Sequence, residues 1–240
     1  MIEVRNLVKD YFGHVAVNDL SFTVEAGEVV GFLGPNGAGK STTMNIITGY
    51  ISATSGQAII NGHDIFDEPE KAKKSIGYLP EQPPLYPDMT VAEYLKFVAE
   101  LKKVKKSERA KMISDIMELT KVDNVKDRLI KFLSKGYKQR VGLAGAIMGY
   151  PEVLILDEPT VGLDPNQIIE IRELIKSLST KHTILLSSHI MQEISAVCDK
   201  IIIINNGRLM AYDTPDNIAR VMEESKELYV TVKGDMDRVR

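Results

Sequence analysis

The start of the chain is dominated by alternating and continuous apolar runs. Residues 2–30 are rich in Val, Phe and Thr, and turn-forming residues at Gly13, Asn18-Asp19 and Ala26-Gly27 divide them into predicted strands. Residues 28–33, EVVGFL, form a nearly continuous apolar run, which is typical of a strand buried on both faces. The pattern therefore predicts several N-terminal strands, the last of which is central in a sheet.

Helical and strand-like patterns alternate again in the second half. A helical spacing at 41–50 and a hairpin around Asn61-Gly62 come first. After residue 150 we expect strands and helices in turn, at 152–160, 165–178, 183–188, 190–197 and 200–207. Strands that alternate with helices indicate a parallel sheet with helices on both faces.

Two segments depart from this alternation. Residues 88–148 show helical periodicity almost throughout, so we expect a mostly helical insert there. The tail offers a short helix and then ELYVTV at 227–232, an alternating strand without a visible partner. A lone strand is not stable by itself. It either joins the sheet or opens a C-terminal segment at 219–240 that continues further, and we favour the second interpretation.

Composition and charge restrict the class of protein. Apolar residues make up 44% of the 240 residues, charged residues 26%, and the net charge is −3. This balance argues against a nucleic-acid binder, which usually has a strong basic excess. The single cysteine, Cys198, excludes an intrachain disulfide and a cysteine metal cluster. The longest aliphatic runs have four residues, far fewer than the roughly 18–20 of a membrane span, so we expect another chain to supply any span.

A glycine loop follows the first buried strand. Its pattern, G-x-x-x-x-G-K-[ST], is met from Gly34 through Pro35, Asn36, Gly37, Ala38, Gly39 and Lys40 to Ser41, and Thr42 follows directly. Glycine lets the backbone approach a phosphate closely, and the N-terminus of the next helix attracts anions. We expect Lys40 to reach the β- and γ-phosphates, Ser41 to bind Mg²⁺ and Thr42 to lie near the α-phosphate. An ordinary glycine turn is the alternative.

A second acidic centre follows the apolar run VLIL. Asp157 and Glu158 end this strand, and the carboxyl ends of parallel strands border the crevice where ligands bind. We expect Asp157 to hold the Mg²⁺ shell and Glu158 to polarise an attacking water. The alternative is an acidic pair that only caps the strand.

The segment LSKGYKQR at 133–140 completes a resemblance. With the glycine loop and the acidic strand, it makes the chain resemble the ATP-binding subunit of an ATP-binding cassette (ABC) transporter, whose signature usually reads LSGGQ. Ser134 and Gly136 match, Lys135 replaces a glycine, and Tyr137 replaces the glutamine. The resemblance implies that this segment closes on the γ-phosphate of ATP held by the opposite subunit, through a helix N-terminus. Lys135 keeps a backbone donor and adds charge.

The resemblance assigns five more residues. Tyr11 occupies the place of the aromatic ring that stacks on adenine, Asp164 in VGLDP lies in the D-loop near the subunit interface, and His189 resembles the switch histidine that contacts the γ-phosphate. A lone Tyr or His is otherwise more often structural. In YLPEQPPLY, Glu81 occupies the usual place of the Q-loop glutamine and Gln82 is its neighbour, so either side chain could reach the metal.

The resemblance spans about residues 2–217 and implies an α/β fold. It consists of a P-loop NTPase core with a mostly parallel sheet, an N-terminal antiparallel β subdomain and a helical insert. We expect the core at 1–87 and 149–218, and the helical signature subdomain at 88–148. The sequence segments around the Q-loop and the signature are similar to those of bacterial exporter subunits of the drug, sodium or gliding-motility type.

The implied function is ATP hydrolysis that drives a separate membrane permease, at the cytoplasmic face of the cell membrane. ATP and Mg²⁺ would lie between two head-to-tail subunits, and no nucleic acid is expected. One alternative is a soluble ABC-type ATPase in DNA repair or on the ribosome; 42–133 is too short for long coiled-coil arms. A P-loop kinase or GTPase is disfavoured because the Asn-Lys-x-Asp motif is missing, and a non-catalytic sensor because Lys40, Asp157, Glu158 and His189 are all present.

Overall fold

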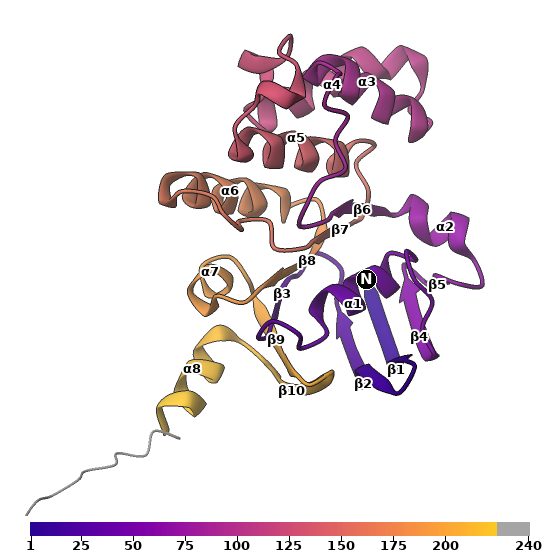
Figure 1. The fold of residues 1–240 in the computed structure, drawn as a ribbon, viewed down its shortest axis with the longest axis vertical. Coiled ribbons are helices and arrows are strands. Elements are labelled where there is room, and N and C mark those ends of the chain that lie inside the picture. Colours follow the sequence, from indigo (N-terminus) through magenta and orange to yellow (C-terminus); the bar gives the residue numbers. More distant parts are fainter. Residues whose placement is uncertain (225–240) are drawn as a thin grey trace, which may run out of the picture.

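A computed structural model describes residues 1–224 of the chain, which form two β-sheets surrounded by helices (Figure 1). The strand predicted at 227–232 lies outside the described residues. Among the described residues, no helix is both long enough and apolar enough to cross a membrane.

The first sheet is antiparallel and four-stranded, in the order β2-β1-β4-β5. Its strands are β1 (Ile2–Tyr11), β2 (His14–Val24), β4 (Ser55–Ile60) and β5 (His63–Asp64). The predicted turns at Gly13 and Ala26-Gly27 are confirmed, as is the hairpin around Asn61-Gly62.

The turn predicted at Asn18-Asp19 is wrong, because these residues lie inside β2. Leu7 of β1 pairs with Leu20 and Lys9 pairs with Val17, so β2 carries an extra residue between the two pairs. This is a β-bulge, which bends a strand without ending it. Asn and Asp favour turns and bulges for the same reason: both tolerate a left-handed backbone, and Asp19 has φ 54°.

The second sheet has six strands in the order β10-β9-β3-β8-β7-β6. All neighbouring pairs are parallel except β10 with β9. The strands are β3 (Val29–Leu33), β6 (Ile76–Leu79), β7 (Val153–Leu156), β8 (Thr183–Ser188), β9 (Lys200–Asn205) and β10 (Arg208–Asp213). The mostly parallel sheet predicted from the strand–helix alternation is confirmed.

Alternate residues of this sheet enter two separate cores. Val30 and Phe32 of β3 pack with α1 (Lys40–Ile47) and the antiparallel sheet, whereas Val29 faces the opposite core. The opposite core contains apolar residues of α6 (Pro165–Leu178) and α7 (Met191–Ser195). Both faces of the sheet are therefore buried, which explains why its strands read as continuous apolar runs.

A helical group packs beyond β6 and β7, at the top of Figure 1. It consists of α3 (Val91–Leu101), α4 (Lys106–Leu119) and α5 (Lys135–Ile147). Thr90 and Glu93 form a capping box that starts α3, since each side chain bonds the other residue's backbone N–H. The helical insert is thus confirmed, and the boundary at 88 and 148 stays a prediction.

The shorter elements differ in how far the sequence predicts them. Helix α2 (Pro69–Lys74) and strands β6 and β10 have no counterpart in the sequence-based prediction, because each is short and lacks a long apolar run. Helix α8 (Pro215–Glu224) confirms the short helix expected in the tail. Helix α7 is shorter than the predicted 190–197.

Candidate functional site

The glycine loop connects the carboxyl end of β3 to the N-terminus of α1. Lys40 is the first residue of α1, and Gly39 before it has φ 102°. A Cβ at Gly39 would lie 2.5 Å from the carbonyl oxygen of Ala16, so only glycine fits. No side chain caps this helix N-terminus, which leaves its first backbone N–H groups available to an anion.

Lys40 is buried inside this loop, with 6% of its surface exposed. Its Nζ donates hydrogen bonds to the carbonyl oxygens of Gly34, at 2.8 Å, and Pro35, at 3.3 Å. Glu158 Oε1 lies 3.5 Å from the same nitrogen. The loop thus holds a desolvated cation directly beside a buried carboxylate.

Asp157 and Glu158 follow β7 directly and are both buried. Ser187, on the neighbouring strand β8, donates its hydroxyl to Asp157 Oδ1 at 2.5 Å and accepts the backbone N–H of Glu158 at 2.9 Å. Glu158 has φ 47°, a left-handed conformation that is uncommon for a residue with a Cβ. One serine therefore sets the positions of two adjacent acids.

His189 follows β8 and lies against Glu158. Its Nδ1 is 3.0 Å from Glu158 Oε2 and 3.2 Å from Oε1, and its side chain remains 42% exposed. Lys40, Glu158 and His189 therefore form a contiguous cluster, although Lys40 lies more than 100 residues before the other two in the sequence.

A hollow of about 320 Å³ opens over this cluster. Its lining combines the glycine loop, the antiparallel sheet and the acidic strand end: Tyr11, His14, Ala16, Asn36, Gly37, Gly39, Lys40, Ser41, Thr42, Glu81 and Glu158. Of the predicted site residues, Gly34, Pro35, Ala38, Asp157 and His189 border this group without lining the hollow. The antiparallel sheet contributes Tyr11, whose ring is 41% exposed and lies 5.0 Å from Lys9 Nζ.

The two Q-loop candidates lie differently. Glu81 lines the hollow, and it also lines an adjacent groove of about 330 Å³ between the core and α5. Gln82 lines only that groove, together with Pro83, Leu85, Pro87, Ile130 and three lysines. The geometry therefore favours Glu81 as the side chain that faces a bound nucleotide.

The signature residues lie elsewhere, at the N-terminus of α5. Ser134 is the N-cap, and its hydroxyl accepts the backbone N–H of Tyr137 at 3.4 Å. Neither Ser134 nor Gly136 lines the hollow over Lys40. Lys135 packs on the D-loop turn, because a Cβ at Gly162 would lie 2.2 Å from its Nζ. Asp164 caps α6 by accepting the N–H of Gln167.

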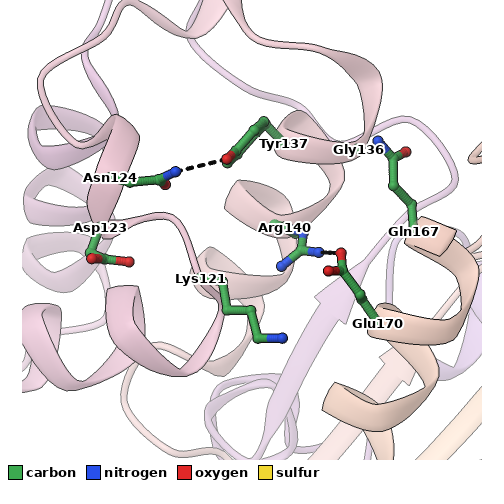
Figure 2. A pocket seen from close by; sticks show the side chains of 8 residues that line it. All are labelled: Lys121, Asp123, Asn124, Gly136, Tyr137, Arg140, Gln167 and Glu170. Carbon is green, nitrogen blue, oxygen red and sulfur yellow. Dashed lines mark hydrogen bonds and ion pairs between the residues drawn. The ribbon is translucent and has the colours of Figure 1, made fainter.

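Gly136 instead lines a second hollow, of about 420 Å³, between α5 and α6 (Figure 2). Asn124 donates a hydrogen bond to the Tyr137 hydroxyl there, at 2.8 Å, and Arg140 forms an ion pair with Glu170 across the two helices. Tyr137, which stands where the signature usually has glutamine, thus bonds to a residue of its own chain.

Metal and phosphate ligands can be assessed from the donor set. Ser41, Asp157 and Glu81 offer a hydroxyl and two carboxylates, the hard oxygen ligands that Mg²⁺ prefers. No cluster of three or more His, Cys, Asp or Glu suited to a metal occurs within residues 1–224. Mg²⁺ usually binds through one or two carboxylates plus substrate phosphates, so this set fits the ion in the presence of a nucleotide.

Sequence reasoning missed Ser187 and His14. Ser187 orders both acids but belongs to no motif, and only the pairing of β7 with β8 brings it to them. His14 lines the hollow because β2 returns beside Tyr11.

Residues 17–161 match the sequence model of the family described as ABC transporter. The linearmycin resistance ATP-binding protein LnrL of Bacillus subtilis is 36% identical over 98% of this chain and 76% of its own length. The bacitracin transport ATP-binding protein BcrA of Bacillus licheniformis is 39% identical over 88% of this chain and 68% of its own length.

Solved structures of ATP-binding cassettes have the same fold as this chain. An ATP-binding subunit of an ABC transporter superposes with a TM-score of 0.84 at 33% identity, covering 93% of each chain. A dimeric ATP-binding cassette in a post-hydrolysis state, bound to ADP and Pi, superposes with a TM-score of 0.81 at 26% identity, over 90% of this chain and 99% of its own. This chain therefore belongs to the ABC transporter family, as an ATP-binding subunit that hydrolyses ATP.

Proposed function

We propose that this chain is the ATPase of an exporter-type transporter and works as a head-to-tail pair. The observation that carries the proposal is the division of the site. Lys40, Glu158 and the glycine loop surround one hollow, while Ser134 and Gly136 lie outside it. One chain thus presents two half-sites, and a second copy or a related subunit would complete each.

Within each site, we assign the phosphates of ATP to the glycine loop, Gly34 to Thr42, and to Lys40. Tyr11 would stack on the adenine, since its ring is partly exposed at the rim of the hollow. Ser41, Asp157 and Glu81 would hold Mg²⁺, with Gln82 as the alternative to Glu81. The ion would neutralise charge on the phosphates.

Glu158 is the proposed general base. Its carboxylate already lies between Lys40 and His189, and its backbone is fixed by Ser187. A bound γ-phosphate would compete with Glu158 for the Lys40 ammonium, which would free the carboxylate to accept a proton from water. His189, partly exposed beside Glu158, would donate to the γ-phosphate.

In the pair, Ser134 and the N–H groups of Gly136 would face the γ-phosphate held by the other chain, at the N-terminus of α5. Lys135 would add positive charge there. Hydrolysis would remove the phosphate that both chains contact and so release the clamp.

The proposed partner is a membrane permease, with the chain at the cytoplasmic face of the membrane. The groove beside Glu81 to Tyr86 is largely apolar and lies between the core, proposed as 1–87 and 149–218, and the helical subdomain, 88–148. A permease segment in that groove would respond to movement between the two. Export is favoured because LnrL and BcrA are named for antibiotic resistance and transport; no relative named here acts in DNA repair or on the ribosome.

Complementation between two inactive variants tests the composite site. Lys40→Ala impairs the glycine loop, and Ser134→Arg impairs the signature, so each variant alone should hydrolyse ATP poorly. A mixture should regain activity, since a mixed pair contains one site with both halves intact. A mixture that stays as inactive as its components would contradict the head-to-tail arrangement.

Purification from native membranes tests the transporter assignment. The tagged protein, extracted in detergent, should retain a protein with several membrane spans, identified by mass. Ribosomal proteins or DNA-processing factors without a membrane partner would leave the ATPase activity intact and overturn the transporter role.

A further inference from the structure

Glu193 is a buried carboxylate that the proposed mechanism does not use. It lies in α7 with 8% of its surface exposed. Within residues 1–224, no Lys, Arg or His forms an ion pair with it. A buried acid without a cationic partner needs hydrogen bonds to offset its lost hydration.

Two hydroxyl groups supply these hydrogen bonds. Thr160 Oγ1 donates to Glu193 Oε2 at 2.6 Å, and Ser188 Oγ donates to the same oxygen at 3.1 Å. Thr160 and Ser188 are both buried. The Ser188 hydroxyl also accepts the backbone N–H of Ile190 at 3.1 Å.

The two donors lie next to the two residues proposed to react, Thr160 in the loop after β7 and Ser188 at the end of β8. Thr160 lies two residues after Glu158, and Ser188 and Ile190 flank His189 on either side. Glu193 therefore connects the loop of the proposed base to the loop of the switch histidine. Ser187, one residue before Ser188, already bonds Asp157 and the backbone N–H of Glu158. The ends of β7 and β8 are therefore joined by two sets of hydrogen bonds, one through Ser187 and one through Glu193.

We propose that Glu193 is a positioning residue that holds Glu158 and His189 in register through Thr160 and Ser188. This inference rests on the roles proposed above for those two residues. Glu193 does not line the hollow over Lys40, so it acts through its neighbours and does not touch the nucleotide. Small displacements of reacting groups can reduce rates by about 100-fold, so such a tie has kinetic consequences.

Substitutions at both ends of the tie test the proposal on the full chain with ATP and Mg²⁺. Glu193→Ala removes the acceptor, and Thr160→Val removes one donor while keeping its shape. We expect both to lower kcat by roughly 10–100-fold while the Kd for ATP changes less than about threefold. Thr160→Ser and Glu193→Gln should retain most activity, because a hydroxyl or one acceptor oxygen remains. Ser195→Ala is the matched control in α7, since among residues 1–224 that hydroxyl bonds only the carbonyl of Met191.

A double-mutant cycle separates positioning from general destabilisation. Because Glu193 is proposed to act through both Glu158 and His189, Glu193→Ala should cause less further loss of kcat in Glu158→Gln and in His189→Ala than it causes alone, since residues that act as a unit are not additive. Fully additive losses in both pairs, or parent-like kcat in folded Glu193→Ala and Thr160→Val, would overturn the proposal. So would a Glu193→Gln variant as impaired as Glu193→Ala.

Glu158→Gln, measured in the same assay, distinguishes two kinds of failure. Full activity in Glu158→Gln would undermine the proposed site itself. An inactive Glu158→Gln beside a parent-like Glu193→Ala would overturn only the role given to Glu193. Thermal unfolding of each variant shows whether the protein is folded at the assay temperature.

Discussion

Lys40 and Glu158 form a pair whose two charges a nucleotide would separate. The ammonium is satisfied by loop carbonyls and by the carboxylate, with both side chains more than 90% buried. Buried charges are stable only when paired, so each group depends on the other until phosphate oxygens take one of them. Before a nucleotide binds, Lys40 is therefore kept in place by the loop carbonyls and by Glu158, and phosphate oxygens would replace these contacts.

Lys40→Ala should weaken ATP binding by about 10- to 100-fold, the equivalent of the 1.5–3 kcal/mol typical of hydrogen bonds to charged groups. The Kd of a fluorescent ATP analogue measures this effect. Lys181→Ala, an exposed change between α6 and β8, is the control and should leave the Kd unchanged. An unaltered affinity in Lys40→Ala would contradict the phosphate-loop assignment.

Glu158→Gln should slow hydrolysis by roughly 10²–10⁴-fold, about 3–5 kcal/mol of barrier, because an amide cannot accept the proton from water. ATP affinity should be retained. Single-turnover hydrolysis measures the rate, and Glu173→Gln on the exposed face of α6 controls for a Glu-to-Gln change. Normal turnover would exclude Glu158 as the base.

Among the elements, the contact between β6 and α5 joins the part of the chain that carries Glu81 to the part that carries the signature segment. Strand β6 leads to Glu81, and α5 starts at the signature. Gly77 of β6 lies directly under α5, since a Cβ there would be 2.3 Å from the carbonyl oxygen of Ala146. The atoms in contact belong to the backbones of β6 and α5, so a larger residue at Gly77 would fit only if the strand or the helix shifted.

Gly77→Ala should therefore destabilise the fold by about 1–3 kcal/mol through overpacking. For a chain of this length, that lowers the Tm by about 2–10 °C in thermal unfolding. Gly145→Ala is the matched control: the three atoms nearest its added Cβ all belong to the Tyr94 side chain, the closest at 3.0 Å, and alanine favours a helix. Equal Tm values for both variants would show that the close β6–α5 contact does not limit packing.

For the molecule as a whole, the proposed head-to-tail pair would complete sites that a single chain leaves unfinished. The hollow over Lys40 and the signature at α5 are separate surfaces of one chain. ATP that contacts both surfaces, each on a different chain, must favour association, because ligand binding stabilises whichever state binds it better. In the proposed pair, hydrolysis would reverse this preference.

Mg-ATP should consequently drive Glu158→Gln into stable pairs, since the nucleotide binds and is hydrolysed very slowly. Light scattering after gel filtration measures the mass. Lys40→Ala with Mg-ATP, and Glu158→Gln without nucleotide, should both elute at the monomer mass of about 26.7 kDa. A Glu158→Gln chain that remains monomeric with saturating Mg-ATP would contradict association through shared nucleotides.

The features that depend on neighbouring residues could be predicted from the sequence. The glycine loop, the strand before Asp157 and the N-cap at Ser134 are local, since their chemistry follows from backbone freedom, burial and helix ends. The parallel sheet was predictable because strands buried on both faces read as apolar runs.

Which distant residues meet depends instead on how the strands are arranged in the fold. The contact of His189 with Glu158, the serine tie at Ser187, and the link from Thr160 to Glu193 each depend on β8 lying beside β7. The choice of Glu81 over Gln82 depends on which side chain faces the hollow. These side-chain hydrogen bonds join residues 29–33 positions apart and produce no periodic pattern in the sequence. They can be identified only once the fold shows which residues are neighbours.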